Sequence, residues 1–149
     1  GAAQALRQRI QGPWPAPEPK RRAKVAGVLG APAAARNLGG ERALLVTTGG
    51  TASILARIKL KLTSFDSEQL ERAVLSASDL ADETRRLWSL NLEDRKRIPG
   101  LPGSRADVIL MGAAILEAAA EALGFDEARV SARGLRYGAL LHAEECVTL

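Results

Sequence analysis

The pattern of apolar positions changes abruptly near residue 49. Residues 43–48 form a continuous apolar run that ends in two threonines, which is typical of a buried strand. Gly49 and Gly50 follow as a turn, and residues 51–60 carry apolar side chains at helical spacing. This stretch therefore predicts a strand, a glycine turn and a helix in succession.

The chain beyond residue 60 alternates between helical and extended patterns. We expect, in order, a helical turn beginning at Phe65-Asp66-Ser67, a strand over 72–76, a helix from Ser76 or Ser78 to about Leu90, a short helix from Asn91 to Arg97, a long helix from Ser104 to Leu123, a strand over 128–131 and a last helix from Gly134 to about Glu145. The alternation predicts an α/β fold, with a short sheet and helices packed on its faces.

Local signals predict helix ends and inward faces. Ser104 and Asp107 match a Ser-x-x-Asp capping box, and Gly124 is expected to end the long helix. Residues 99–103 contain two prolines and two glycines, so they separate the long helix from the preceding one. The expected inward positions are Leu80, Thr84, Leu87 and Trp88 in one helix, and Ile109, Ala113, Leu116 and Ala120 in the other.

The first 40 residues differ from the rest and form a separate region whose place in the fold the sequence does not predict. Residues 2–11 predict a helix, 12–19 hold four prolines and predict extended chain, and 20–29 predict a short helix before a loop to Gly40. The basic run 20–24 is more typical of a solvated helix face than of a nucleic-acid site, because no aromatic residues are interleaved with it.

Composition narrows the class of protein. The 149 residues suit one domain, and only 3% are aromatic, so the core must consist of aliphatic side chains. A formal net charge of +4 favours an anionic partner. One cysteine and one histidine allow neither an internal disulfide nor a zinc site, which indicates the cytoplasm. No apolar run approaches the roughly 20 residues of a membrane helix.

The segment from Thr47 to Ser53 is a candidate anion site. Glycines let a ligand approach the backbone, and a helix N-terminus presents free N–H groups and a positive dipole end. Thr51 could cap the helix or donate its hydroxyl to a ligand. The alternative is that Gly49 and Gly50 serve turn geometry alone.

Two further segments combine arginine with possible turn residues. Arg105 at a helix start opposes the helix dipole, so one explanation is a bound phosphate or base, and the other is a surface position without functional meaning. Asp107 at the same helix start is explained by the helix dipole itself. In the segment Ser131 to Gly138, Gly134 is expected to supply an unusual backbone angle. Gly138 is expected to mark close packing against another backbone or a ligand.

Taken together, the three segments resemble the Ppx/GppA phosphatase family. Its G-T-G-G-T-x-x-x-L-A segment is similar to residues 47–56, with Thr47 in place of the first glycine. Its R-A-D-V-I segment is similar to residues 105–109, after a Pro-Gly-Leu stretch at 99–101. Its S-x-x-G-L-R-x-G segment is similar to residues 131–138, with Tyr137 in place of the usual glutamate. Order and spacing agree over about residues 41–142.

The resemblance implies that residues 41–149 are the C-terminal part of the second domain of an actin-like enzyme. Such enzymes remove terminal phosphate from polyphosphate or guanosine pentaphosphate, usually with a divalent metal such as Mg²⁺. Ligand binding is then expected at Gly49, Gly50, Thr51 and Arg105. The supporting residues are expected to be Thr48, Asp107, Ser131, Gly134, Arg136 and Gly138.

The same resemblance implies that parts of the enzyme lie outside this sequence. The family's Asp-Ile-Gly-Gly-Gly-Ser segment and catalytic glutamate are not found in the 149 residues. We therefore expect no catalytic residue here, a partner N-terminal domain, and no hydrolysis by this chain alone. Without the opening strands the sheet is expected to have an exposed edge, which favours a homodimer, a second chain or a covering N-terminal segment.

Three classes of function stay open at this point. The first is a catalytically incomplete phosphatase fragment. The second is a regulatory module that binds a nucleotide or polyphosphate without catalysis. The third is a fragment of an ATP-dependent kinase of the actin-like fold.

Overall fold

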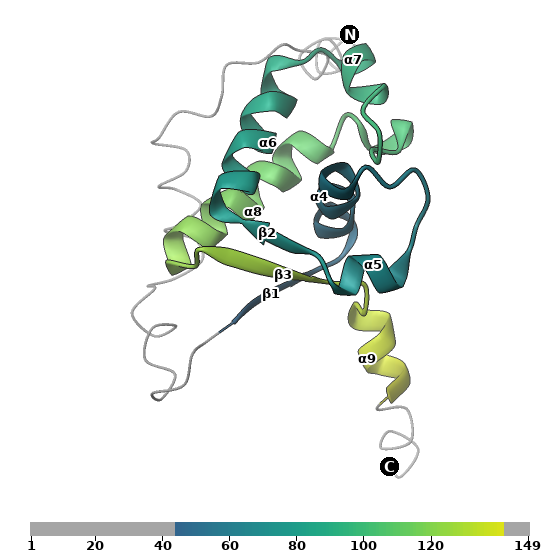
Figure 1. The fold of residues 1–149 in the computed structure, drawn as a ribbon, viewed down its shortest axis with the longest axis vertical. Coiled ribbons are helices and arrows are strands. Elements are labelled where there is room, and N and C mark those ends of the chain that lie inside the picture. The colour runs from purple at the N-terminus through teal and green to yellow at the C-terminus, as the bar shows by residue number, and fades with distance from the viewer. Residues whose placement is uncertain (1–43, 142–149) are drawn as a thin grey trace, which may run out of the picture.

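The structure, a computed structural model, describes residues 44–141 (Figure 1). The described elements are β1 (Leu45–Thr48), α4 (Gly50–Leu60), α5 (Ser67–Glu71), β2 (Val74–Ser76), α6 (Ala77–Ser89), α7 (Leu92–Lys96), the 3-10 turn η1 (Gly103–Arg105), α8 (Ile109–Leu123), β3 (Glu127–Ser131) and α9 (Leu135–Leu141). The predicted α/β fold with a short sheet is confirmed. The elements expected within residues 1–40 lie outside the described residues.

The described sheet has the strand order β1-β3-β2, with β3 in the centre. β1 runs parallel to β3 and pairs Leu45 with Ala128 and Thr48 with Ser131, whereas β2 runs antiparallel to β3. The helices α4, α6 and α8 lie together over one face of the sheet (Figure 1). Ala128, Val130 and Leu75 point into that layer and are buried. The core therefore lies between one sheet face and three helices.

The helix α6 follows its sequence signals closely. Ser76 is its N-cap and accepts a hydrogen bond from the Asp79 backbone N–H at 3.0 Å, while the Asp79 carboxylate accepts one from the Ser76 N–H at 2.8 Å. This reciprocal capping box pairs two backbone donors that the helix itself leaves free. All four positions expected to face inward are buried, namely Leu80, Thr84, Leu87 and Trp88.

The Arg95 side chain closes the other end of α6. It lies on α7 and is fully buried, and its Nη1 donates to the carbonyls of Leu87 and Leu90 at 3.3 and 3.1 Å. These carbonyls belong to the last turn and the C-cap of α6, where the helix leaves acceptors unpaired. Burial lowers the pKa of the Arg95 guanidinium, and the nearby Asp107 carboxylate opposes that shift. The buried cation therefore ties α6, α7 and the loop before α8 together.

The long helix starts later than its sequence pattern predicts. α8 begins at Ile109, and residues 103–105 form η1 instead of the first turn of α8. The predicted capping box of Ser104 and Asp107 is wrong, because the Asp107 carboxylate accepts from the adjacent Val108 N–H at 2.9 Å. The C-terminal prediction is confirmed, since Gly124 ends α8 in the left-handed conformation.

Three other local predictions are corrected. β1 is not a buried strand, because Val46 is 58% exposed and the strand shows alternating burial, which is the pattern of a strand covered on one face. Gly134 does not adopt a positive φ. A Cβ atom on Gly138 would meet no atom within 4 Å, so close packing does not explain this glycine.

β1 lies at one edge of the described sheet. Among the described residues β1 pairs with β3 alone, which leaves the backbone groups of its other edge unpaired within that part of the chain. Self-association through this edge remains a prediction. No helix among residues 44–141 is long and apolar enough to cross a bilayer.

The loop after α7 rests directly on the backbone of α4. Gly100 has φ +91°, and a Cβ atom there would come within 2.6–2.7 Å of backbone atoms of Arg57 and Ile58. Only glycine avoids both the steric cost of the positive φ and this overlap. Ile98 and Leu101 are buried on either side of it. The loop that carries η1 is therefore fixed against α4.

We expect Gly100→Ala to lower the free energy of unfolding by about 2–4 kcal/mol, because it adds an overlap with backbone to an unfavourable φ. Urea titration followed by circular dichroism measures the change. Gly138→Ala is the matched control, since its Cβ meets no atom within 4 Å. Equal stability of the two variants would contradict the close contact.

We expect the capping box of α6 to make stability depend on pH. Burial opposes the charge of Asp79, but hydrogen bonds from Lys59 and Ser76 outweigh it and lower the pKa of that carboxyl. Its contribution is full above the unfolded pKa of about 3.9 and is lost as pH falls through the lower folded pKa.

Asp79→Asn should therefore lower the free energy of unfolding by about 1 kcal/mol at neutral pH, and the difference from the unsubstituted chain should vanish near pH 2. Denaturant titrations over this pH range test it. Asp82→Asn is the control, because Asp82 forms only an exposed ion pair with Arg85. A pH-independent loss in Asp79→Asn would show that charge is not involved.

Candidate functional site

The parallel pairing of β1 with β3 brings two loops to the same end of the sheet. Thr48 lies opposite Ser131 in the register, so the turn before α4 and the turn before α9 leave the sheet side by side. Between them and η1 lies a cavity of about 690 Å³, here called the arginine cavity. Its lining consists of Gly49, Gly50, Ser53, Ile54, Arg57, Phe65, Pro102, Ser104, Arg105, Ala132, Gly134, Leu135 and Arg136.

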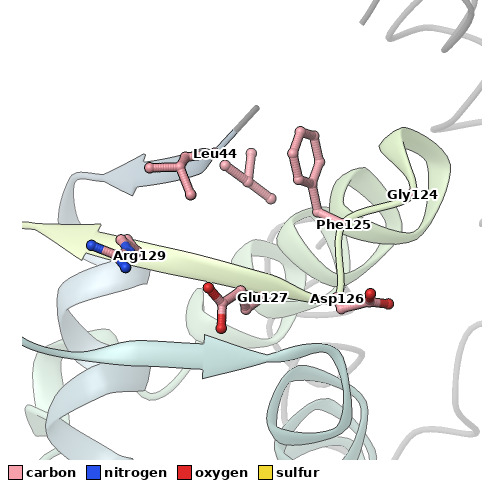
Figure 2. Close-up of a pocket in the computed structure, with 7 residues that line it drawn as sticks. Leu44, Gly124, Phe125, Asp126, Glu127 and Arg129 are labelled. Atoms are coloured by element: carbon pink, nitrogen blue, oxygen red, sulfur yellow. The ribbon is translucent and has the colours of Figure 1, made fainter. Parts of the chain in front are cut away.

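The arginine cavity has a strongly positive lining. Arg57, Arg105 and Arg136 contribute three guanidinium groups, and none of the lining residues within 44–141 is a carboxylate. Other clefts of the described part differ in charge. The cleft of about 230 Å³ between Leu44 and Phe125 carries Asp126 and Glu127 against one arginine, Arg129 (Figure 2). The clefts along α6 are also predominantly acidic.

The N-terminus of α4 opens onto this cavity. Gly49 is the N-cap with φ +94°, no side chain caps the helix, and its first turn holds no acidic residue. A Cβ atom on Gly49 or Gly50 would meet nothing within 4 Å. The first N–H groups of this eleven-residue helix therefore have no side-chain cap, and no described atom crowds the two glycines beside them, which suits an anion.

The three arginines differ in how free their guanidinium groups are. Arg57 donates from Nε and Nη2 to the carbonyls of Leu62 and Thr63, at 3.4 and 3.0 Å, so it contributes charge with few remaining donors. Arg105 is exposed on η1, and Arg136 is exposed in the first turn of α9. Neither forms an ion pair within the described residues. Arg105 and Arg136 are thus the cations available to a ligand.

The structure brings most of the predicted ligand residues together. Gly49, Gly50 and Arg105 line one cavity, and Gly134 and Arg136 join them. Thr51 is not part of the lining, because its side chain lies on the opposite side of α4, against Gly112 of α8.

The remaining predicted residues lie around the cavity or away from it. Thr48 and Ser131 lie behind the lining, where the Thr48 hydroxyl donates to the Ser131 carbonyl at 3.0 Å. Asp107 lies beyond η1, close to Arg95. Gly138 lies farther along α9 and does not line the cavity.

Two functional candidates escaped the sequence analysis. Arg57 follows Gly50 and Ser53 by seven and four positions, so helical spacing alone places it on their face of α4. Glu71 is different, because its carboxylate contacts the loop after β3, 60 positions away. No local pattern signals such a contact.

The lining does not suit a divalent metal ion. Mg²⁺ prefers carboxylate oxygens, whereas the charged groups of this cavity are three arginines. Residues 44–141 also contain no group of three or more acidic, histidine or cysteine side chains that could hold a metal ion. The charged side chains among the described lining residues are all cations, which suit an anion better than a metal ion.

Fold and cavity together define a mixed α/β unit whose parallel strand ends converge on a basic cavity. A comparison with protein families identifies it further, since the model of the Ppx/GppA phosphatase family matches residues 17–146. The chain belongs to the Ppx/GppA phosphatase family. A search of the curated proteins finds no match.

Solved structures agree with this assignment. The chain is similar to a Ppx/GppA enzyme of Aquifex aeolicus, with a TM-score of 0.69, 26% identity, and coverage of 82% of this chain and 40% of that one. The type II variant from the same organism matches with a TM-score of 0.67 and 24% identity, over 80% of this chain and 37% of that one. An exopolyphosphatase from Cytophaga hutchinsonii matches with a TM-score of 0.60 and 19% identity, over 88% of this chain and 44% of that one. The chain thus spans less than half the length of these structures and corresponds to part of their actin-like fold.

The contact between Thr51 and Gly112 is directly testable. A Cβ atom on Gly112 would collide with the Thr51 hydroxyl and methyl groups. We expect Gly112→Ala to lower the free energy of unfolding by about 1–3 kcal/mol. Thr51→Ala should restore part of that loss in the double variant, giving a coupling above about 0.5 kcal/mol in a double-mutant cycle. Strict additivity would mean that Thr51 points elsewhere.

Proposed function

We propose that this chain forms one side of the ligand cleft of a phosphatase that removes terminal phosphate from polyphosphate or guanosine pentaphosphate. The observation that carries the proposal is the arginine cavity itself. It joins the N-terminus of α4 to Arg105 and Arg136, which form no ion pair within residues 44–141, and none of its described lining residues is a carboxylate. Family membership supports phosphatase chemistry, and the substrate class is inferred from the charge of the cavity.

The physical fit is to a ligand with several neighbouring negative charges. A guanidinium binds phosphate oxygens with two parallel hydrogen bonds, and a helix N-terminus adds backbone donors and a positive potential. A volume of about 690 Å³ lies within the range of small-molecule sites and accommodates several phosphate groups. The cavity is open on one side, so a longer chain or a nucleoside can extend beyond it.

In this proposal the chain binds the ligand and other residues carry out the hydrolysis. Attack on a phosphoanhydride needs a group that orients water and cations that absorb charge. The arginine cavity offers cations but no carboxylate to orient the water. A divalent ion such as Mg²⁺ would then be held by the phosphate groups and by residues outside this lining. A cytoplasmic location and an N-terminal partner domain belong to the same proposal.

A second candidate is a regulatory module that binds the same ligands without catalysis. The same lining favours it, because its charged side chains are all arginines and none is suited to act as a general base. The two candidates predict the same binding and differ only in whether a partner domain completes a hydrolase.

Titration calorimetry with tripolyphosphate, guanosine pentaphosphate and ATP tests the binding proposal. We expect Arg105→Ala and Arg136→Ala each to raise Kd for tripolyphosphate about tenfold, because a hydrogen bond to a charged group contributes about 1.5 kcal/mol. We also expect no phosphate release by the isolated chain.

Arg85→Ala is the matched control for this titration. It removes the same charge from α6, where Arg85 pairs with Asp82 on the exposed surface away from the cavity. Equal weakening by all three substitutions would show that net charge alone attracts the ligand, which would refute the site. The order of affinities for the three ligands separates a polyphosphate site from a nucleotide site.

A further inference from the structure

The loop between β3 and α9 is held by a single carboxylate from another part of the chain. Glu71, the last residue of α5, accepts hydrogen bonds on one oxygen, Oε1, from the Ser131 hydroxyl at 3.0 Å and from the Ala132 N–H at 2.8 Å. The Ser131 hydroxyl also accepts from the Arg133 N–H at 3.1 Å. Glu71 therefore fixes the path of the chain as it leaves β3.

A second tether reaches the same loop from β1. The Thr48 hydroxyl donates to the Ser131 carbonyl at 3.0 Å, and a Cβ atom on Gly134 would lie 3.5 Å from that hydroxyl. The loop is thus held between α5 on one side and the end of β1 on the other.

This loop and the first turn of α9 together supply about a third of the residues that line the arginine cavity. Ala132, Gly134, Leu135 and Arg136 are all part of the lining, whereas Glu71 and Ser131 are not. None of the residues of α9 is buried, so packing of the helix against the body does not fix its start. The position of Arg136 in the cavity then depends on the tethers of the loop.

The location of Glu71 has no explanation within α5. A carboxylate at a helix C-terminus opposes the helix dipole, and no cationic side chain of the described residues pairs with Glu71. Its support is nevertheless rigid. Leu70 beside it is fully buried, and the Ala73 carbonyl accepts from the Val130 N–H of β3 at 3.0 Å. The carboxylate is therefore presented to the loop from a fixed point.

We propose that Glu71 is a positioning residue of the arginine cavity, which holds the β3–α9 loop so that Arg136 and the Gly134 backbone meet a phosphorylated ligand. The inference rests on the proposed binding of phosphate compounds. It assigns to a negatively charged residue a favourable effect on anion binding, because the hydrogen bonds of its carboxylate order the loop. Simple electrostatics predicts the opposite sign, since removing a nearby negative charge strengthens anion binding.

Titration of the full chain with tripolyphosphate tests the inference. We expect Glu71→Ala to raise Kd about tenfold, and Glu71→Gln, which keeps an acceptor oxygen, to stay within about threefold of the unsubstituted chain. Glu68→Ala is the matched control on the same helix. It removes the same charge, and within residues 44–141 the Glu68 side chain pairs with Arg72 alone, on the exposed surface. We expect its Kd to change less than about twofold.

Hydrogen exchange gives a readout that does not depend on the ligand. The amides of residues 132–136 should exchange faster in Glu71→Ala and remain unchanged in Glu68→Ala. Should Glu71→Ala fail to fold, Ser131→Ala replaces it, since it removes one of the two donors to Oε1.

Two results would overturn the inference, and they are distinguishable. Binding by Glu71→Ala that equals or exceeds that of the unsubstituted chain, or equal weakening by Glu68→Ala, refutes the role of Glu71 while the proposed function stands. No binding of tripolyphosphate by the unsubstituted chain refutes the proposed function and, with it, this inference.

Discussion

The parallel pairing of β1 with β3 is the constraint on which the candidate site depends. Parallel strands end at the same edge of a sheet, so the chain must leave both strands side by side. The register sets Thr48 opposite Ser131, and the α4 N-terminus and the start of α9 then share one cavity. A shift of one residue in this register would turn every outward side chain of β1 inward.

The side of the cavity that η1 forms depends on packing between helices. Gly100 lies against the α4 backbone, and Arg95 joins the end of α6 to α7, so the loop that carries Arg105 is fixed on its N-terminal side. Three separate elements, α4, η1 and α9, therefore each supply one arginine to the cavity. Because each part rests on a different element, the positive charges are held together by the fold in spite of their mutual repulsion.

Sequence patterns predicted the elements well wherever one local signal dominated. The capping box at Ser76 and Asp79 and the inward face of α6 needed only helical spacing. The start of α8 was wrong because Ser104 and Asp107 have the spacing of a capping box, while the contacts of the preceding loop hold these residues in η1 and the turn after it. The roles of Thr51 and Gly138 were predicted from their positions at the start of one helix and inside another, and such positions do not say which neighbours a residue meets.

The sequence by itself determined the alternation of strands and helices and the glycine turn before α4, because these follow from periodicity and local backbone preference. It also indicated the family, through the order and spacing of three segments that resemble those of its members. Only the tertiary structure decided that Arg57, Arg105 and Arg136 face one cavity, that Thr51 faces α8, and that Glu71 holds the loop after β3. The physical reason is distance along the chain. Local preferences act over a few residues, whereas the hydrogen bonds of Glu71 join residues 60 and 61 positions apart, and the three arginines of the cavity are spread from residue 57 to residue 136. Such contacts exist only once the sheet has paired.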